Sequence, residues 1–114
     1  MTAYSNLTPP EVIETLATIG KDIDDGTDDI ALRDEEAVRA RVAYQVAYAR
    51  SFLSHEGSMD VRKQQAVLDC ADLLLAHEIA EQQQRAAVSH VKALRDRLEI
   101  GRSISALVRL EWQS

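Results

Sequence analysis

The chain has 114 residues and a net charge of −6, a size that predicts one domain. Its single cysteine excludes an intramolecular disulfide and favours a reducing compartment. No N-terminal signal pattern and no apolar run of membrane-spanning length is present, so we expect a cytoplasmic protein without membrane contact.

Residues 1–27 are predicted to form an N-terminal arm, a short helix and an acidic turn. The helix should begin at Thr8-Pro9-Pro10-Glu11, where Thr8 and Glu11 can form a capping box. Its apolar side is made of Val12, Ile13, Leu16, Ile19 and Ile23. This side could pack against the rest of the chain.

The stretch from Asp22 to Asp29 contains Gly26 and five Asp, which predicts a solvated turn. It resembles the start of a calcium-binding loop, but the Gly comes one residue early and no Glu stands at the twelfth position. We therefore expect neither a calcium site nor any other metal here.

Residues 28–114 are predicted to form a long helical hairpin with its turn at 57–58. The first helix should run from Asp28 or Asp29 to about Glu56, and it carries an apolar line at helical spacing formed by Val38, Val42, Val46, Ala49 and Leu53. Gly57 tolerates positive φ and Ser58 is a preferred N-cap, so a reversal is expected between the two helices.

The stretch from Ser58 to Trp112 is predicted to be one very long helix or two collinear ones, because it contains no Pro and one Gly, Gly101. Apolar positions follow alternating steps of four and three, as in a coiled coil: Ala66, Cys70, Leu73, His77, Ala80, Gln84, Ala87, Val91, Leu94 and Leu98. The predicted oligomer seam consists of Leu73, Ala80, Ala87, Val91, Leu94 and Leu98.

The expected fold is therefore all-α, a long antiparallel coiled-coil-like hairpin with a short N-terminal helix. The first hairpin helix is too short to cover the whole second one. A second copy of the chain, the N-terminal helix or a fold-back at Gly101 must cover the remainder, and we expect oligomerisation to complete a helical bundle.

No catalytic site, metal or cofactor is predicted. His77 and Glu81 lie one turn apart, but the second His of a zinc-protease motif is missing, so a buried or rim histidine is favoured. Asp69 and Asp72 are expected to be solvent-facing partners of nearby Arg or Lys. Cys70 lies on the apolar seam and is expected to be structural.

Two candidate binding surfaces lie toward the C-terminus. The basic ridge consists of Arg85, Lys92, Arg95, Arg102 and Arg109. It could follow the phosphates of single-stranded DNA or bind a partner, although a charged coiled-coil flank is the simpler interpretation. The apolar tip consists of Leu107, Leu110 and Trp112. It could dock into a groove of a protein partner.

Three segments carry a resemblance: Ala-Arg-Ser-Phe-Leu-Ser-His-Glu-Gly-Ser-Met-Asp-Val-Arg-Lys-Gln-Gln-Ala at 49–66, Val-Lys-Ala-Leu-Arg-Asp-Arg-Leu-Glu at 91–99 and Gly-Arg-Ser-Ile-Ser-Ala-Leu-Val-Arg-Leu-Glu at 101–111. The chain resembles small helical proteins of tailed bacteriophages, which share a Glu-Gly-Ser turn and a C-terminal Arg-x-x-Leu-x-x-x-Arg-(Ser/Thr)-Leu-Leu pattern. Ile104 and Ala106 depart from that Leu-rich ending. Genes of this family often lie in replication and recombination cassettes.

The first hypothesis is a non-enzymatic, oligomeric helical accessory protein of phage origin. It would assist DNA replication or recombination in the cytoplasm of the host bacterium, through a protein partner of that machinery or through single-stranded DNA. The alternative is a structural or host-directed protein-protein interaction module with no nucleic-acid role. The homo-oligomer is expected to be a dimer or larger.

Overall fold

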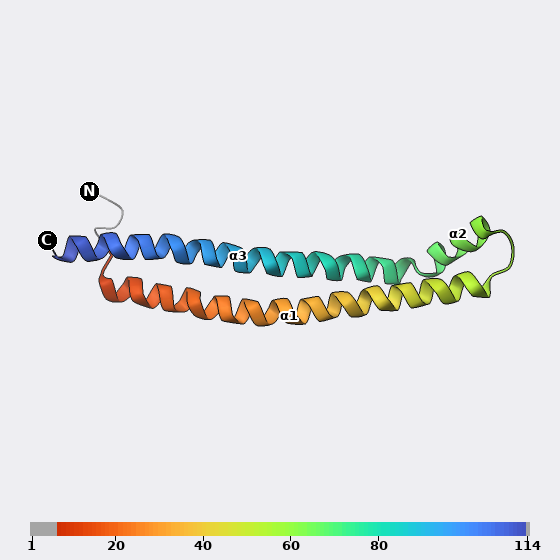
Figure 1. Ribbon diagram of the computed structural model, residues 1–114, viewed down its shortest axis with the longest axis horizontal. Helices are drawn as coiled ribbons and strands as arrows, with labels where there is room; N and C mark the ends of the chain where they lie inside the picture. Colours follow the sequence, from red (N-terminus) through yellow and green to blue (C-terminus); the bar gives the residue numbers. More distant parts are fainter. Residues whose placement is uncertain (1–6, 114) are drawn as a thin grey trace. The chain divides into compact units, whose positions relative to one another are not determined.

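The computed structural model describes residues 7–113. They form three α-helices, α1 (Pro9–Ser54), α2 (Met59–Asp69) and α3 (Ala71–Gln113), and no residue of this range lies in a strand (Figure 1). The predicted all-α class is confirmed. The described residues divide into two compact units: unit 1 combines residues 7–29 with 88–113, and unit 2 is Ile30–Ala87.

The start of α1 is the capping box that the sequence predicts. The Thr8 amide donates to Glu11 Oε2 at 3.1 Å, and the Glu11 amide donates to Thr8 Oγ1 at 3.4 Å. Two of the amides that a helix N-terminus leaves without partners are thereby satisfied.

The prediction of an acidic turn at residues 22–29 is wrong, because α1 continues through this stretch without interruption. The short N-terminal helix and the first hairpin helix are therefore one helix of 46 residues. The run has no Pro, and Thr27 donates its hydroxyl to the Ile23 carbonyl at 2.9 Å, as a residue inside a helix can. A calcium loop cannot form in this helical backbone.

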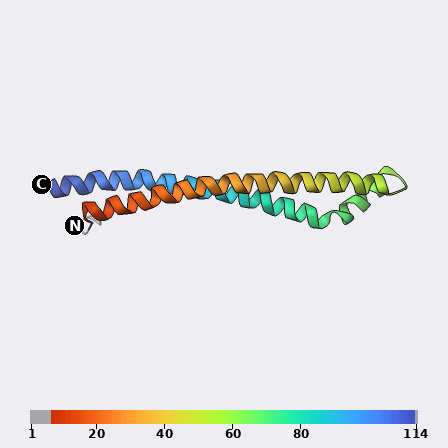
Figure 2. The same cartoon turned by 90° about the horizontal axis from the view of Figure 1, so that it is seen from below.

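Unit 1 pairs the first part of α1 with the end of α3, and Figures 1 and 2 show these segments side by side. Gly26 lies against Val91: a Cβ atom at Gly26 would come within 2.7 Å of Val91 Cγ2. Gly101 similarly faces Leu16, whose Cδ2 would lie 2.5 Å from an added Cβ. Both glycines thus receive a bulky aliphatic side chain from the opposite helix, which explains their presence inside helices.

The reversal in unit 2 lies between Ser54 and Met59. Gly57 has a φ of 112°, which only glycine adopts without strain. Ser58 is the N-cap of α2, and its Oγ accepts from the Val61 amide at 3.3 Å. Asp60 stands in the first turn of α2, where its charge favours the helix dipole.

The long C-terminal stretch is two helices. α2 ends at Asp69, and its C-cap Cys70 has a ψ of 12°, which departs from helical values. α3 begins at Ala71. α3 then passes through Gly101 without a break, so a fold-back at Gly101 does not occur. Three ways to cover the apolar face of the long stretch were expected: a second copy of the chain, the N-terminal helix or a fold-back at Gly101. In unit 1 the N-terminal part of α1 packs on this face.

The face of α1 that turns inward follows steps of four and three along the whole helix. Every member is buried or half-buried: Val12, Leu16, Ile19, Ile23, Gly26, Ile30, Arg33, Ala37, Ala40, Tyr44, Ala47 and Ser51. In unit 1 this face is aliphatic, and in unit 2 it is mostly small or polar. The contact surfaces of the two units are therefore made of different side chains.

Candidate functional site

An exposed apolar stripe on α1 is the most distinctive surface of unit 2. We call it the outer stripe; it consists of Val38, Val42, Val46, Ala49 and Leu53. Val38, Val42 and Val46 are 41–47% exposed, and Leu53 is 77% exposed. The sequence identified this line, but the structure places it outside the packed face of the helix. Close contact between helices selects small side chains such as Ala37, Ala40 and Ala47 for the inner face.

The C-terminal end of the outer stripe opens into a hollow of about 360 Å³. Tyr48 and Phe52 of α1 and Lys63 of α2 line it, together with Ala49 and Leu53 of the stripe. The Arg62 guanidinium lies 5.8 Å from the centre of the Phe52 ring, a distance typical of a cation–π contact. The apolar surface of the stripe therefore continues across the end of α1.

Five of the six residues of the predicted oligomer seam lie on the inward side of α3. Ala87, Val91 and Leu94 are at most 7% exposed in the single chain, and Ala80 and Leu98 are half-buried. Leu73 is 38% exposed, and its neighbour Leu74 turns inward instead. The heptad pattern marks the packing of α3 within its own chain, so this face is not available to a second copy.

Many large apolar side chains of the described residues are exposed. Eighteen large apolar side chains are exposed, against seven buried residues in the apolar core of the described range. Exposed apolar side chains that lie together on one face are typical of association sites.

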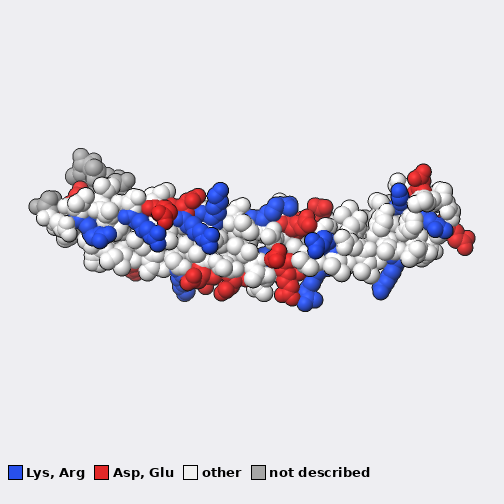
Figure 3. Space-filling view, viewed as in Figure 1, with Lys and Arg blue, Asp and Glu red and all other residues white. Residues whose placement is uncertain are grey.

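The basic ridge is exposed, but acidic side chains surround it. In unit 1, Arg102 pairs with Glu99 at 2.8 Å, while Lys92, Arg95 and Arg109 form no ion pair with residues 7–113. Unit 1 carries ten acidic and six basic residues, and Figure 3 shows the two kinds interspersed on the visible face. In unit 2, Arg85 lies 3.9 Å from Glu81.

The apolar tip is exposed at the end of α3. Leu107 is 47% exposed, and Leu110 and Trp112 are 62–63% exposed. Trp112 donates its indole N–H to the Leu7 carbonyl at 3.3 Å, whereas Val108 is fully buried. The tip therefore consists of side chains on the outer side of a helix that is itself anchored in unit 1.

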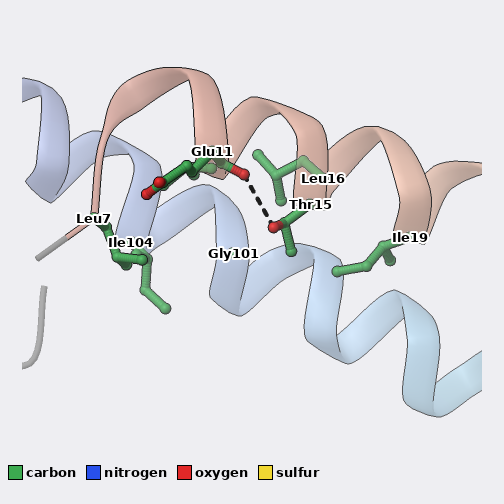
Figure 4. Close-up of a pocket in the computed structure, with 8 residues that line it drawn as sticks. Leu7, Glu11, Thr15, Leu16, Ile19, Gly101 and Ile104 are labelled. Carbon is green, nitrogen blue, oxygen red and sulfur yellow. Dashed lines mark hydrogen bonds between the residues drawn. The ribbon is translucent and has the colours of Figure 1, made fainter.

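A small apolar cavity of about 160 Å³ lies between α1 and α3 in unit 1. Figure 4 shows Leu16 and Ile19 of α1 with Ile104 and Gly101 of α3, and the Thr15 hydroxyl donating to the Glu11 carbonyl. Because its polar side chains already bond to the helix backbone or its cap, the cavity offers no free group for a reaction.

A cluster that the sequence did not reveal joins the end of α1 to the end of α2. His55 Nε2 donates to Asp69 Oδ2 at 2.7 Å, and Ser51 Oγ donates to the same oxygen at 2.7 Å. The hydrogen bond from His55, and secondarily that from Ser51, lowers the pKa of Asp69 below its ordinary value. The expectation that Asp69 pairs with Arg or Lys is wrong.

This cluster does not have the geometry of a nucleophilic triad. In such a triad the histidine lies between the serine and the carboxylate and accepts the serine proton. Here Ser51 and His55 both donate to Asp69, so the imidazole cannot activate the hydroxyl. The hydrogen bonds of these three residues connect the C-terminal end of α1 to the end of α2. We call Ser51, His55 and Asp69 the clasp.

The remaining candidate residues are structural. The side chain of His77 is 13% exposed and its ring stacks on Tyr44, with centroids 6.0 Å apart, so the expected rim or buried position is confirmed. Cys70 is buried. Across residues 7–113 no group of three His, Cys, Asp or Glu is placed to hold a metal, and none of the described helices is apolar over a bilayer-spanning length.

Comparisons of the chain with protein-family models, with curated proteins and with solved structures found no match. The resemblance to tailed-phage proteins therefore stays a prediction from the sequence.

Proposed function

We propose that this chain is a non-enzymatic helical accessory protein that acts by associating with other polypeptides, including copies of itself. The observation that carries the proposal is the outer stripe, five apolar residues on one exposed helix face of a chain with a small apolar core. Exposed apolar surface of this extent is typical of association sites. The phage resemblance supports a role beside the replication or recombination machinery.

The mass of the chain in solution tests the proposal. Light scattering over a concentration series should give a mass above the 12.7 kDa of one chain, rising with concentration as a reversible equilibrium requires. A mass of one chain throughout the series, without any binding partner, would contradict self-association.

Single-stranded DNA is the second candidate, favoured by the three exposed cations Lys92, Arg95 and Arg109, which have no ion-pair partner within residues 7–113. A labelled oligonucleotide at low salt should shift, and Arg95→Glu should weaken binding several-fold. Arg97→Glu is the matched control, because it makes the same charge change on the opposite side of α3. Equal effects of the two variants, or no shift at low salt, would remove this candidate.

The apolar tip favours a host-directed module as a further alternative. Leu107→Lys combined with Leu110→Lys should abolish capture of such a partner while leaving the buried Val108 in place. Unchanged capture would exclude the tip as the binding surface.

A further inference from the structure

The outer stripe has charged residues of opposite sign at its two ends. Asp34, Glu35 and Glu36 stand at the N-terminal end, and Arg50 stands near the C-terminal end. All are exposed. Glu35 pairs with Arg39 at 2.8 Å and Glu36 with Arg33 at 3.5 Å on the same helix, whereas Arg50 and Asp34 form no ion pair within residues 7–113. From Val38 to Leu53 the stripe is about 24 Å long, which is about four helical turns.

This distribution of charge identifies the occupant that fits the stripe. A helix with the same sequence, lying antiparallel on the stripe, brings its acidic end beside Arg50 and its own Arg50 beside the acidic end of the first helix. A parallel copy would place acidic end beside acidic end and Arg50 beside Arg50, which is unfavourable. The sequence of the stripe is thus complementary to itself in one orientation.

We propose that two copies of the chain associate through their outer stripes in antiparallel orientation, with Val42 on the two-fold axis. This inference rests on the proposed function and specifies its partner. In this register Val38 lies opposite Val46 of the second copy, Leu53 opposite Ala31, and Arg50 opposite Asp34 and its acidic neighbours. The contact is isologous, so each pair of residues occurs twice.

Charge selects this register over its neighbour. With Val46 on the axis only Val46 meets its own copy, because Val42 would lie opposite Arg50 and Val38 opposite Ser54. The acidic end would then lie opposite the turn that follows α1. Both charge contacts are then lost. Of these two registers, the one centred on Val42 aligns apolar with apolar residues and acidic with basic residues at once.

The size of the contact predicts a modest affinity. A specific interface buries about 800 Å² on each partner, and five residues of one helix provide only part of this area. The aliphatic stems of Arg39 and Arg41, which flank the stripe in sequence and are exposed, can cover more. We therefore expect dissociation constants in the micromolar range, on the order of 10⁻⁶ M.

Disulfide trapping tests the orientation and the register. In the full chain with Cys70→Ala, Val42→Cys should form a covalent dimer on mild oxidation, because the two thiols meet at the axis. Leu53→Cys is the control: its position is more exposed, but the two thiols would be about 33 Å apart. A mixture of the Leu53→Cys and Ala31→Cys chains should instead yield the mixed dimer.

Charge exchange tests the complementarity without cysteine. Arg50→Glu should weaken the dimer about tenfold, because a reversed contact occurs twice in the symmetric pair. Asp34→Lys should weaken it to a similar extent, because Asp34 lies opposite Arg50 in this register and forms no ion pair within residues 7–113. The double variant should recover most of the affinity, because the exchanged charges again face each other.

The outcomes separate this inference from the proposed function. Covalent dimer from Val42→Cys but little from Leu53→Cys, with recovery in the double charge variant, is the expected result. A chain that has dimer mass yet traps Leu53→Cys as well as Val42→Cys, or shows no recovery, overturns the stripe-centred dimer while self-association stands. A single-chain mass at every concentration overturns both.

Discussion

Unit 1 and unit 2 use the same helical spacing and reach different degrees of self-sufficiency. Unit 1 buries four large apolar residues, Val12, Val91, Leu94 and Val108, whereas unit 2 buries only Ala66, Cys70 and Ala87. Twelve of the eighteen exposed large apolar side chains lie in unit 2. A heptad pattern thus establishes which face packs, but the size of the side chains on that face decides how much stability the packing provides.

Polar and aromatic contacts take the place of the missing aliphatic ones in unit 2. Arg33 donates to Gln83 at 3.1 Å, and Tyr44 stacks on His77. A hydrogen bond contributes about 1 kcal/mol net, while burial of a large aliphatic side chain contributes about 1.5–3 kcal/mol. We infer that unit 2 is the less stable unit in an isolated chain and the one that gains most from association.

Removal of a large side chain should produce the largest difference between the units. Leu94→Ala in unit 1 should reduce the free energy of unfolding by about 2–4 kcal/mol, because Leu94 is 4% exposed and its loss leaves a cavity. Leu75→Ala in unit 2 should change it by less than about 0.5 kcal/mol, because Leu75 is 60% exposed. Urea denaturation followed by circular dichroism measures both.

The Leu75 variant is also the control for loss of helix. Alanine favours a helix at least as well as leucine, so neither substitution should lower helicity by itself. Equal losses of stability at the two positions would mean that both units bury their apolar side chains to the same extent. Unit 1 would then not be the better packed of the two.

A second comparison concerns two glycines of α1 in unit 1. Gly26→Ala should destabilise the chain by about 1 kcal/mol, because the new Cβ meets Val91 Cγ2 at 2.7 Å and the branched valine has little freedom to rotate. Gly20→Ala should stabilise it by about 0.5–1 kcal/mol, since no atom lies within 4 Å of its added Cβ and alanine favours the helix. Thermal melting of both variants gives the sign.

These glycine variants test whether close contact, rather than a turn, explains Gly26. If both substitutions stabilised the chain equally, Gly26 would not be needed to admit Val91, and the tight packing of unit 1 would have to be attributed to other residues.

Much of the fold could be predicted from local patterns. The Thr8 and Ser58 caps and the seam of α3 follow from short-range rules that the structure obeys. The acidic stretch was predicted wrongly because Gly26 and five Asp usually mark a turn. The corrective signal was that the four-three spacing from Val12 to Ile23 continues through Gly26 into Ile30 and beyond.

The candidate site was harder to predict for a different reason. Composition suggests that a line of valines is the core, yet in unit 2 the alanines face inward and the valines outward. Which face of a helix packs depends on the distance between the two helix axes. The spacing of apolar residues along one helix does not reveal that distance. The break at Cys70 has no Pro or Gly near it in the sequence. The His55–Asp69 hydrogen bond joins a residue of the turn after α1 to the last residue of α2.

The smallest expected effect concerns the clasp of unit 2 and its dependence on pH. The pKa of Asp69 is lower in the folded chain than its ordinary value of 3.8. A depressed pKa means that ionised Asp69 stabilises the fold above the unfolded value, and that this contribution disappears as the pH falls through the folded value. Asp69→Asn should therefore be less stable than the native chain at pH 7, and the difference should shrink below about pH 4.

Glu78→Gln is the matched control, because Glu78 is also exposed in unit 2 and forms no ion pair with the described residues. The two substitutions remove the same charge, so a change found only for Asp69→Asn is due to the hydrogen bonds that Asp69 accepts. Unfolding curves at pH 7, 5, 4 and 3 separate the two variants. A constant Asp69→Asn deficit across this series would show that the clasp works through neutral hydrogen bonds, so that unit 2 gains nothing from the charge on Asp69.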